Sequence, residues 1–167
     1  MAVIATSKSY LSSVLMSDVT SLVPDFNYAQ VNLKEAANTT VKLGQLVVWN
    51  GTDAFRVLKN ADFTNDTTLT APAGVSSLPD GAAIGVVVGF NGSLGGEYDA
   101  TVGTTAVKAH VLFRGTASVK DTHTDGGLQF DAGVSAPRQA TAKRLLEQAL
   151  IDVKPVLAQV SSSFYGY

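Results

Sequence analysis

The sequence predicts a mainly β protein: a small β-sandwich or barrel-like domain with one helix in its C-terminal half and an N-terminal arm. From residue 43 onward, short runs of apolar and β-branched residues are separated by Gly, Pro, Asn and Asp, as in strands joined by turns. One stretch near the C-terminus instead repeats its apolar residues at helical spacing. We therefore expect an arm at 1–43 and a β-rich domain at 44–167.

The first predicted strands form a hairpin. Two apolar runs, 46–49 and 54–58, flank Asn50 and Gly51, which suit a type I′ turn that Thr52 and Asp53 can lengthen. Residues 60–81 are polar and rich in Pro and Gly, so we expect a long surface loop. Residues 82–90 are continuously apolar, which is typical of a strand covered on both faces.

A further strand is predicted at 105–114, where apolar and mostly polar side chains alternate. The apolar set is Val107, Ala109, Val111 and Phe113, and the other set is Lys108, His110, Leu112 and Arg114. Gly115 marks a bend before an extended segment at 116–120, and 128–130 can add a short strand. A closing strand is expected at 156–160.

The helix is predicted at about 136–153. Ser135 can cap it, Pro137 suits its first turn, and Pro155 should stop it. Its expected buried stripe consists of Ala142, Leu145, Leu146, Ala149, Leu150 and Val153.

The N-terminal segment allows two interpretations. It is rich in Ser, Thr and Asn, and its apolar residues between 11 and 23 fall near helical spacing. It can form a short helix packed on its own domain, or it can be an arm laid on a neighbouring molecule. Its apolar residues favour contact with protein rather than with solvent.

Composition narrows the function. Charged residues make up 16% of the chain, against about 25% in typical soluble domains, so the surface is uncharged or covered by a partner. The net charge is −2 and the 12 basic residues are scattered, which argues against a nucleic-acid partner. There is no cysteine, no secretory signal at the start and no long apolar segment of the kind that crosses a bilayer. We expect synthesis in the cytoplasm and no membrane insertion.

The search for chemistry yields few candidates. In the segment 121–125, Asp121, His123 and Asp125 could present three ligands to a metal, but Asp and Thr followed by two glycines are also typical of a polar loop, which we favour. His110 is expected to be exposed or at an interface rather than a general base. The Asn-x-Ser/Thr triplets at Asn38, Asn50, Asn65 and Asn91 are expected to be turns. No catalytic residue, metal or cofactor site is predicted, and the chain is not expected to be an enzyme.

Three segments resemble the head decoration proteins of tailed phages, the lambda-type group and its longer relatives. They are 80–87 (DGAAIGVV), 109–119 (AHVLFRGTASV) and the helix from 143 to 153 that leads into Lys154, Pro155 and Val156. The resemblance covers roughly residues 44–160. The chain departs from the lambda-type members by its longer N-terminal segment and its long 60–81 loop.

This resemblance implies a structural virion protein that binds the outside of an assembled capsid and stabilises it by bridging major capsid protein subunits. It further implies a homo-oligomer, with a trimer favoured, and a location on the outer capsid surface after synthesis in the host cytoplasm. We expect capsid or subunit contacts from apolar and aromatic residues of both terminal segments: Val3, Ile4, Tyr10, Leu11, Val14, Leu15, Phe164, Tyr165 and Tyr167.

Two alternatives stay open. Another virion or surface structural module, such as a tail-tube, fibre or adhesin component, would share the composition but would assemble without a shell. A small hydrolase or sugar-binding enzyme would need a cleft with convergent polar groups.

Overall fold

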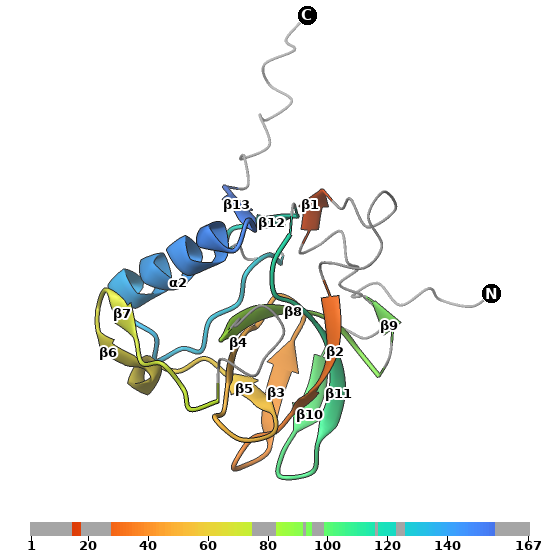
Figure 1. Cartoon of the computed structure of the whole chain (residues 1–167). Helices are drawn as coiled ribbons and strands as arrows, with labels where there is room; N and C mark the ends of the chain where they lie inside the picture. Colours follow the sequence, from red (N-terminus) through yellow and green to blue (C-terminus); the bar gives the residue numbers. More distant parts are fainter. Residues whose placement is uncertain are drawn as a thin grey trace, which may run out of the picture.

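The chain is mainly β, as predicted, and its centre is a closed five-stranded barrel (Figure 1). The computed structural model describes residues 15–17, 28–74, 83–91, 93–94, 99–115, 117–122 and 126–155. The barrel strands, in spatial order, are β11 (Val107–Leu112), β2 (Tyr28–Leu33), β5 (Phe55–Val57), β4 (Leu46–Trp49) and β8 (Ile84–Phe90). Since β11 pairs with both β2 and β8, the ring closes. Strand β9 (Ser93–Leu94) continues the sheet beyond β8.

The barrel follows the hydrophobic pattern of its strands. Every residue of β8 is buried, as expected for a continuously apolar strand. In β11, Ala109 and Val111 are fully buried, whereas Lys108 is exposed and His110 is half-buried, as the predicted alternation requires. Leu112, on the other predicted face, is fully buried as well, so the alternation does not hold at the end of the strand. Gly85 lies in β8 where the side chain of Val111 crosses it, so that a β-carbon there would stand 2.4 Å from Val111 Cγ1.

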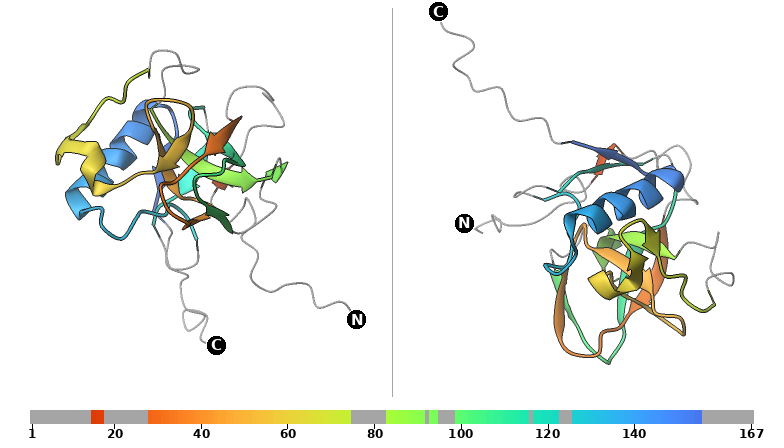
Figure 2. Two further views of the ribbon diagram at one scale, coloured as in Figure 1. Left: turned by 90° about the horizontal axis from the view of Figure 1, so that it is seen from below. Right: turned by 90° about the vertical axis from the view of Figure 1, so that its left-hand side faces the viewer.

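Smaller pairs of strands surround the barrel (Figure 2). Strand β3 (Thr39–Lys42) pairs with β10 (Asp99–Val102), and β6 (Phe63–Asn65) pairs with β7 (Thr68–Leu69) after a 3₁₀ turn, η1 (Asn60–Asp62). A separate three-stranded sheet contains β1 (Leu15–Ser17), β12 (Ser118–Lys120) and β13 (Asp152–Lys154). Instead of a further strand, the segment expected at 128–130 makes one isolated bridge, between Gln129 and Gln45.

The predicted helix is present as α2 (Ala136–Gln148) and packs beside the barrel (Figure 1), but it is shorter than expected. It ends because Leu150 adopts a left-handed conformation with φ +64°. The N–H groups of Leu150 and Ile151 donate to the carbonyls of Glu147 and Leu146, both at 3.0 Å. Leu150 is 65% exposed, so it is not in the buried stripe, and Val153 belongs to β13 rather than to the helix. The helix therefore ends before Pro155, and Pro155 is not the residue that stops it.

The N-terminal boundary also needs correction. Strands β2 and β3 precede residue 44, and β2 is a barrel strand, so from Tyr28 the chain is part of the β domain and not of an arm. The described residues Leu15–Ser17 form a strand antiparallel to β12, not the helix suggested by the spacing of residues 11–23. The rest of the segment before Tyr28, and the closing strand expected at 156–160, lie outside the described residues.

The expected 60–81 loop contains regular secondary structure. Its first ten residues form η1 and the β6–β7 pair, which lie against α2. Arg138 of the helix donates from Nη1 to the carbonyl of Asn60 at 2.6 Å, and Thr141 donates to the carbonyl of Asp66 at 2.6 Å. Polar composition concealed these strands because most of their side chains are exposed, with Phe63 alone buried.

Candidate functional site

The barrel has an open seam between β2 and β5. These two strands run parallel and pair at one position, Leu33 with Phe55. Just beyond it, Lys34 N–H donates to the carbonyl of Phe55 at 2.9 Å. Strand β2 extends back to Tyr28, but β5 begins at Phe55, and the residues before it form the β4–β5 loop. The N-terminal half of β2 therefore has a strand partner on its β11 side alone, within the described part of the chain.

A cleft of about 280 Å³ lies at this open seam. It is lined by Ala29, Gln30, Val31, Asn32, Trp49, Asp53, Ala54, Phe55, Lys108 and Phe113. Three aromatic rings lie in sequence along it: Trp49 is 5.3 Å from Phe55 between ring centroids, and Phe55 is 5.0 Å from Phe113. Trp49 contacts Phe55 edge to face, a favourable geometry for aromatic pairs. The cleft thus combines an aromatic wall with the backbone edge of β2.

The β4–β5 loop is held rigid by one side chain. Asn50 Oδ1 accepts hydrogen bonds from the backbone N–H groups of Thr52, Asp53 and Ala54 at 2.8, 3.0 and 3.2 Å. Gly51 has φ +89°, whereas Asn50 does not have the positive φ that a type I′ turn requires. The hairpin is confirmed. Its loop has five residues, because Trp49 pairs with Phe55, so Thr52 and Asp53 do lengthen the turn. Asn50 acts as the turn residue predicted for the Asn-x-Ser/Thr triplets, and Asn65 does the same through Thr67 N–H at 2.9 Å.

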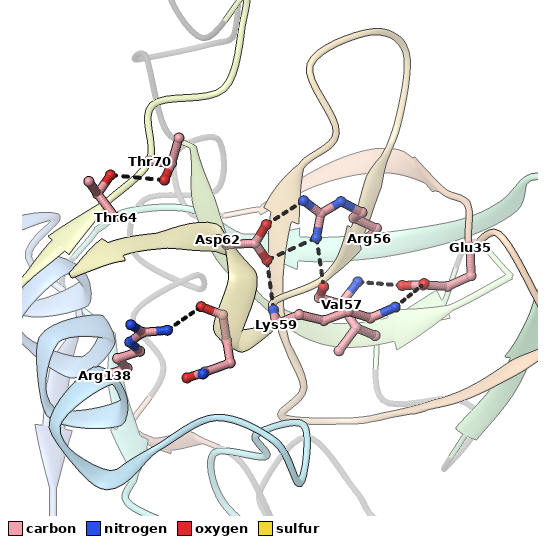
Figure 3. Close-up of polar contacts among 9 residues, drawn as sticks. Glu35, Arg56, Val57, Lys59, Asp62, Thr64, Thr70 and Arg138 are labelled. Carbon is pink, nitrogen blue, oxygen red and sulfur yellow. Dashed lines mark hydrogen bonds and ion pairs between the residues drawn. The ribbon is translucent and has the colours of Figure 1, made fainter. Parts of the chain in front are cut away.

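On the other side of the Leu33–Phe55 pair, a carboxylate closes the seam (Figure 3). Glu35 is 5% exposed. Its Oε1 accepts the backbone N–H of Val57 at 2.6 Å, and its Oε2 accepts from Lys59 Nζ at 3.1 Å. Glu35 N–H donates to the carbonyl of Gly103 at 2.8 Å, on the side of the chain away from β5. The side chain of Glu35 therefore replaces a missing strand partner of β5.

Asp62 organises the next part of the same network (Figure 3). Its carboxylate accepts two hydrogen bonds from Arg56, one of them from Nη1 at 2.9 Å, and also the backbone N–H of Lys59 at 2.7 Å. The hydrogen bond to Asp62 raises the pKa of Arg56 further above its ordinary value. Since Asp62 belongs to η1 and Arg56 to β5, the network connects the barrel to the segment that binds Arg138 of α2.

The rim of the cleft carries little net charge. Lys34 and Asp53 form an ion pair across the seam, and the hydrogen bonds from Lys34 and then Asn50 lower the pKa of Asp53. Lys108 is exposed at the rim, and among the residues that the structure describes it has no ion-pair partner. The cleft therefore suits an uncharged, aromatic occupant, one ring of which can contact the ammonium group of Lys108.

Most of the predicted contact residues cannot be placed. Val3, Ile4, Tyr10, Leu11, Val14, Phe164, Tyr165 and Tyr167 lie outside the described residues. Leu15 of β1 pairs with Val119 of β12, and neither residue lines the cleft. The residues of the cleft were not predicted as a site, although Trp49 and Phe55, two aromatics on either side of a turn, were a usable signal.

The structure describes only part of the segment that was a candidate for metal binding. Asp121 forms an ion pair with Lys143 Nζ at 2.5 Å, while His123 and Asp125 lie outside the described residues. Partial burial raises the pKa of Asp121, but hydrogen bonds from Lys143 and from Thr122 N–H outweigh it and the net shift is downward. His110 is half-buried, and in the described structure its Nε2 has no hydrogen-bond partner.

The described residues contain no group of three or more His, Asp or Glu side chains arranged to hold a metal ion. Nor does any helix in that part of the chain have the length and apolar character needed to cross a membrane. No protein-family model matches the chain, and neither the curated proteins nor the solved structures compared with it gave a match.

Proposed function

We propose that this chain is a structural virion protein, a decoration protein that binds the outside of an assembled tailed-phage capsid and stabilises the shell by bridging major capsid protein subunits. We further propose that it acts without enzymatic activity, as a homo-oligomer, with a trimer favoured. The proposal starts from the three segments that resemble the lambda-type decoration family.

One observation carries the proposal: these three segments, distant in sequence, pack as one unit. Strand β8 contains the end of the first segment and pairs with β11 of the second, Val86 opposite Leu112. Strand β12 continues the second segment and runs parallel to β13, Val119 opposite Val153. Helix α2 contacts both β8 and β13. The resemblance thus falls on residues that form a common core, rather than on isolated surface matches.

The surface chemistry is consistent with this role. Several charges of the described residues are paired with one another, including Lys34 with Asp53, Arg56 with Asp62 and Lys143 with Asp121. Broad contacts between uncharged surfaces gain affinity when many copies act together on one shell. The β6–β7 pair belongs to the 60–81 segment in which this chain is longer than the lambda-type members. It lies beside α2 and enlarges one side of the domain.

The test is binding of the purified chain to empty shells assembled from the major capsid protein of the phage that encodes it. We expect saturable co-sedimentation, density on the outer surface at local symmetry axes by electron microscopy, and shells that withstand higher temperature. Absence of binding to these shells would refute the proposal. Assembly of the chain alone into tubes or fibres would instead favour the tail-tube or fibre alternative.

A further inference from the structure

The free edge of β2 presents unpaired backbone groups to the cleft. In a strand, the N–H and C=O of one residue point to the same side, and the side alternates at each residue. Lys34 N–H points to β5, because it donates to Phe55. By alternation the backbone groups of Gln30 also face the seam, where the described residues offer them no partner. An extended segment laid in the cleft can therefore add to β2 as a strand.

The chain itself carries a segment suited to this position. Residues 161–167, Ser-Ser-Ser-Phe-Tyr-Gly-Tyr, hold three of the 13 aromatic residues of the chain within four positions. We call them the aromatic tail. In an extended conformation Tyr165 and Tyr167 share one face. Aromatic side chains bury a large area for few rotatable bonds and pack well on other rings, and their faces attract cations.

We propose that the aromatic tail of one copy inserts into the β2–β5 cleft of a neighbouring copy. Tyr165 and Tyr167 then pack against Trp49, the partly exposed ring of the three, since Phe55 and Phe113 are themselves buried. The tail backbone pairs with Gln30, and Lys108 contacts a tail ring. Such a head-to-tail contact uses two different surfaces, so its repetition closes into a ring when the rotation between copies allows it. This inference does not depend on capsid binding, and it is tested without a shell.

Trp49 reports on the cleft directly, because it is the chain's one tryptophan and lies in the cleft wall. A tail-deletion variant lacking residues 161–167 is titrated with a synthetic peptide of that sequence, and emission is excited at a wavelength that tryptophan alone absorbs. We expect a saturable change in Trp49 emission. Lys108→Ala should weaken peptide binding by about 3- to 10-fold through loss of the cation–ring contact. Lys42→Ala, which removes an exposed lysine from β3 and not from the cleft, should bind the peptide unchanged.

Mass measurement by light scattering tests the contact between copies. The full chain should be oligomeric and the tail-deletion variant monomeric, with matching circular dichroism spectra. Val31→Glu places a charge in the cleft of a copy that keeps its tail and should also give a monomer. A mixture of the Val31→Glu and tail-deletion variants retains one intact cleft and one intact tail, so it should form heterodimers but no larger rings.

Three results would overturn the inference. One is an unchanged mass after tail deletion. Another is a monomeric full chain whose Trp49 emission still differs from that of the tail-deletion variant, which would place the tail in the cleft of its own chain. The third is no response of Trp49 to the peptide in a tail-deletion variant that melts like the full chain. If Val31→Glu fails to fold, Lys108→Ala in the peptide titration remains decisive.

Discussion

The carboxylate of Glu35 accepts the backbone N–H of Val57 at 2.6 Å, in the place where a longer β2 would have offered a carbonyl. The Leu33–Phe55 pair divides the β2–β5 seam into a part that Glu35 closes and a part that stays open. The closed part carries the Glu35 and Asp62 network, and the open part forms the aromatic cleft.

Removal of the Glu35 carboxylate should destabilise the barrel. Glu35→Ala leaves the buried N–H of Val57 without a partner and should lower the free energy of unfolding by about 2 to 3 kcal/mol. Glu35→Gln keeps an acceptor oxygen and loses only the ion pair with half-exposed Lys59, so its cost should be about 1 kcal/mol. Chemical denaturation measures both, and equal losses for the two variants would contradict this role.

Leu146 and Leu150 should respond very differently to truncation, although the sequence placed both in one helical stripe. Leu146 is fully buried, so Leu146→Ala should cost about 2 to 5 kcal/mol. Leu150 is 65% exposed, and Leu150→Ala should change stability by less than about 0.5 kcal/mol. Thermal melting of the two variants side by side gives the comparison, and a large loss for Leu150→Ala would show that it is buried in the monomer.

Leu150→Gly should stabilise the protein. Leu150 follows the helix with φ +64°, where an L-residue with a β-carbon pays about 1 to 2 kcal/mol and glycine pays none. Part of this gain is lost because glycine makes the unfolded chain more flexible, so a net gain of about 0.5 to 1 kcal/mol is expected. A rise in melting temperature for Leu150→Gly, absent in Leu150→Ala, would isolate the backbone effect from the loss of the side chain.

Gly85→Ala should destabilise the crossing of β8 and β11. The added β-carbon would stand 2.4 Å from Val111 Cγ1 and 2.9 Å from the carbonyl oxygen of Leu112, and the backbone oxygen cannot move away freely. We expect a loss of about 1 to 3 kcal/mol. The double variant Gly85→Ala with Val111→Ala removes the side-chain clash. It should therefore lose less unfolding free energy than the two single variants lose in sum. Additive losses would mean that Val111 is not the obstacle.

The ion pair between Asp121 and Lys143 should give stability that depends on pH. The folded-state pKa of Asp121 lies below its ordinary value of 3.8. A lowered folded-state pKa means that the contribution is present above pH 4 and is lost as the pH falls through the folded-state pKa. Asp121→Asn should therefore cost less than about 1 kcal/mol at pH 7, since the pair is partly exposed, and should cost less still near pH 2. A difference that is constant from pH 7 to pH 2 would show that the charge of Asp121 is not involved.

Local patterns determined several strands of this protein and the approximate place of its helix. The alternation in 105–114 and the apolar run 82–90 predicted β11 and β8, because a side chain's place on a face of a strand depends on neighbours in sequence. Asn50 and Gly51 predicted a hairpin for the same local reason. Within 60–81, by contrast, the strands β6 and β7 were missed, since most of their side chains are exposed and polar. The residues on either side of β6 are held by a helix far along the chain.

Tertiary structure alone decided the closure of the barrel, the burial of Glu35 and the position of the cleft. Each depends on residues far apart in sequence: β11 must meet both β2 and β8, and Glu35 must meet Val57. A glutamate among polar residues has no local feature that marks it as buried, and the gap beside β2 exists because β5 starts late relative to it. The helix ends at Leu150 in a conformation usually adopted by glycine, and no residue type marks that end in the sequence. The residues Leu146 before it and Ile151 after it are both fully buried, so the packing of the core determines the path of the chain there. Local periodicity specifies which residues face a core, whereas the free energy of packing distant segments decides how the core closes and what it leaves open.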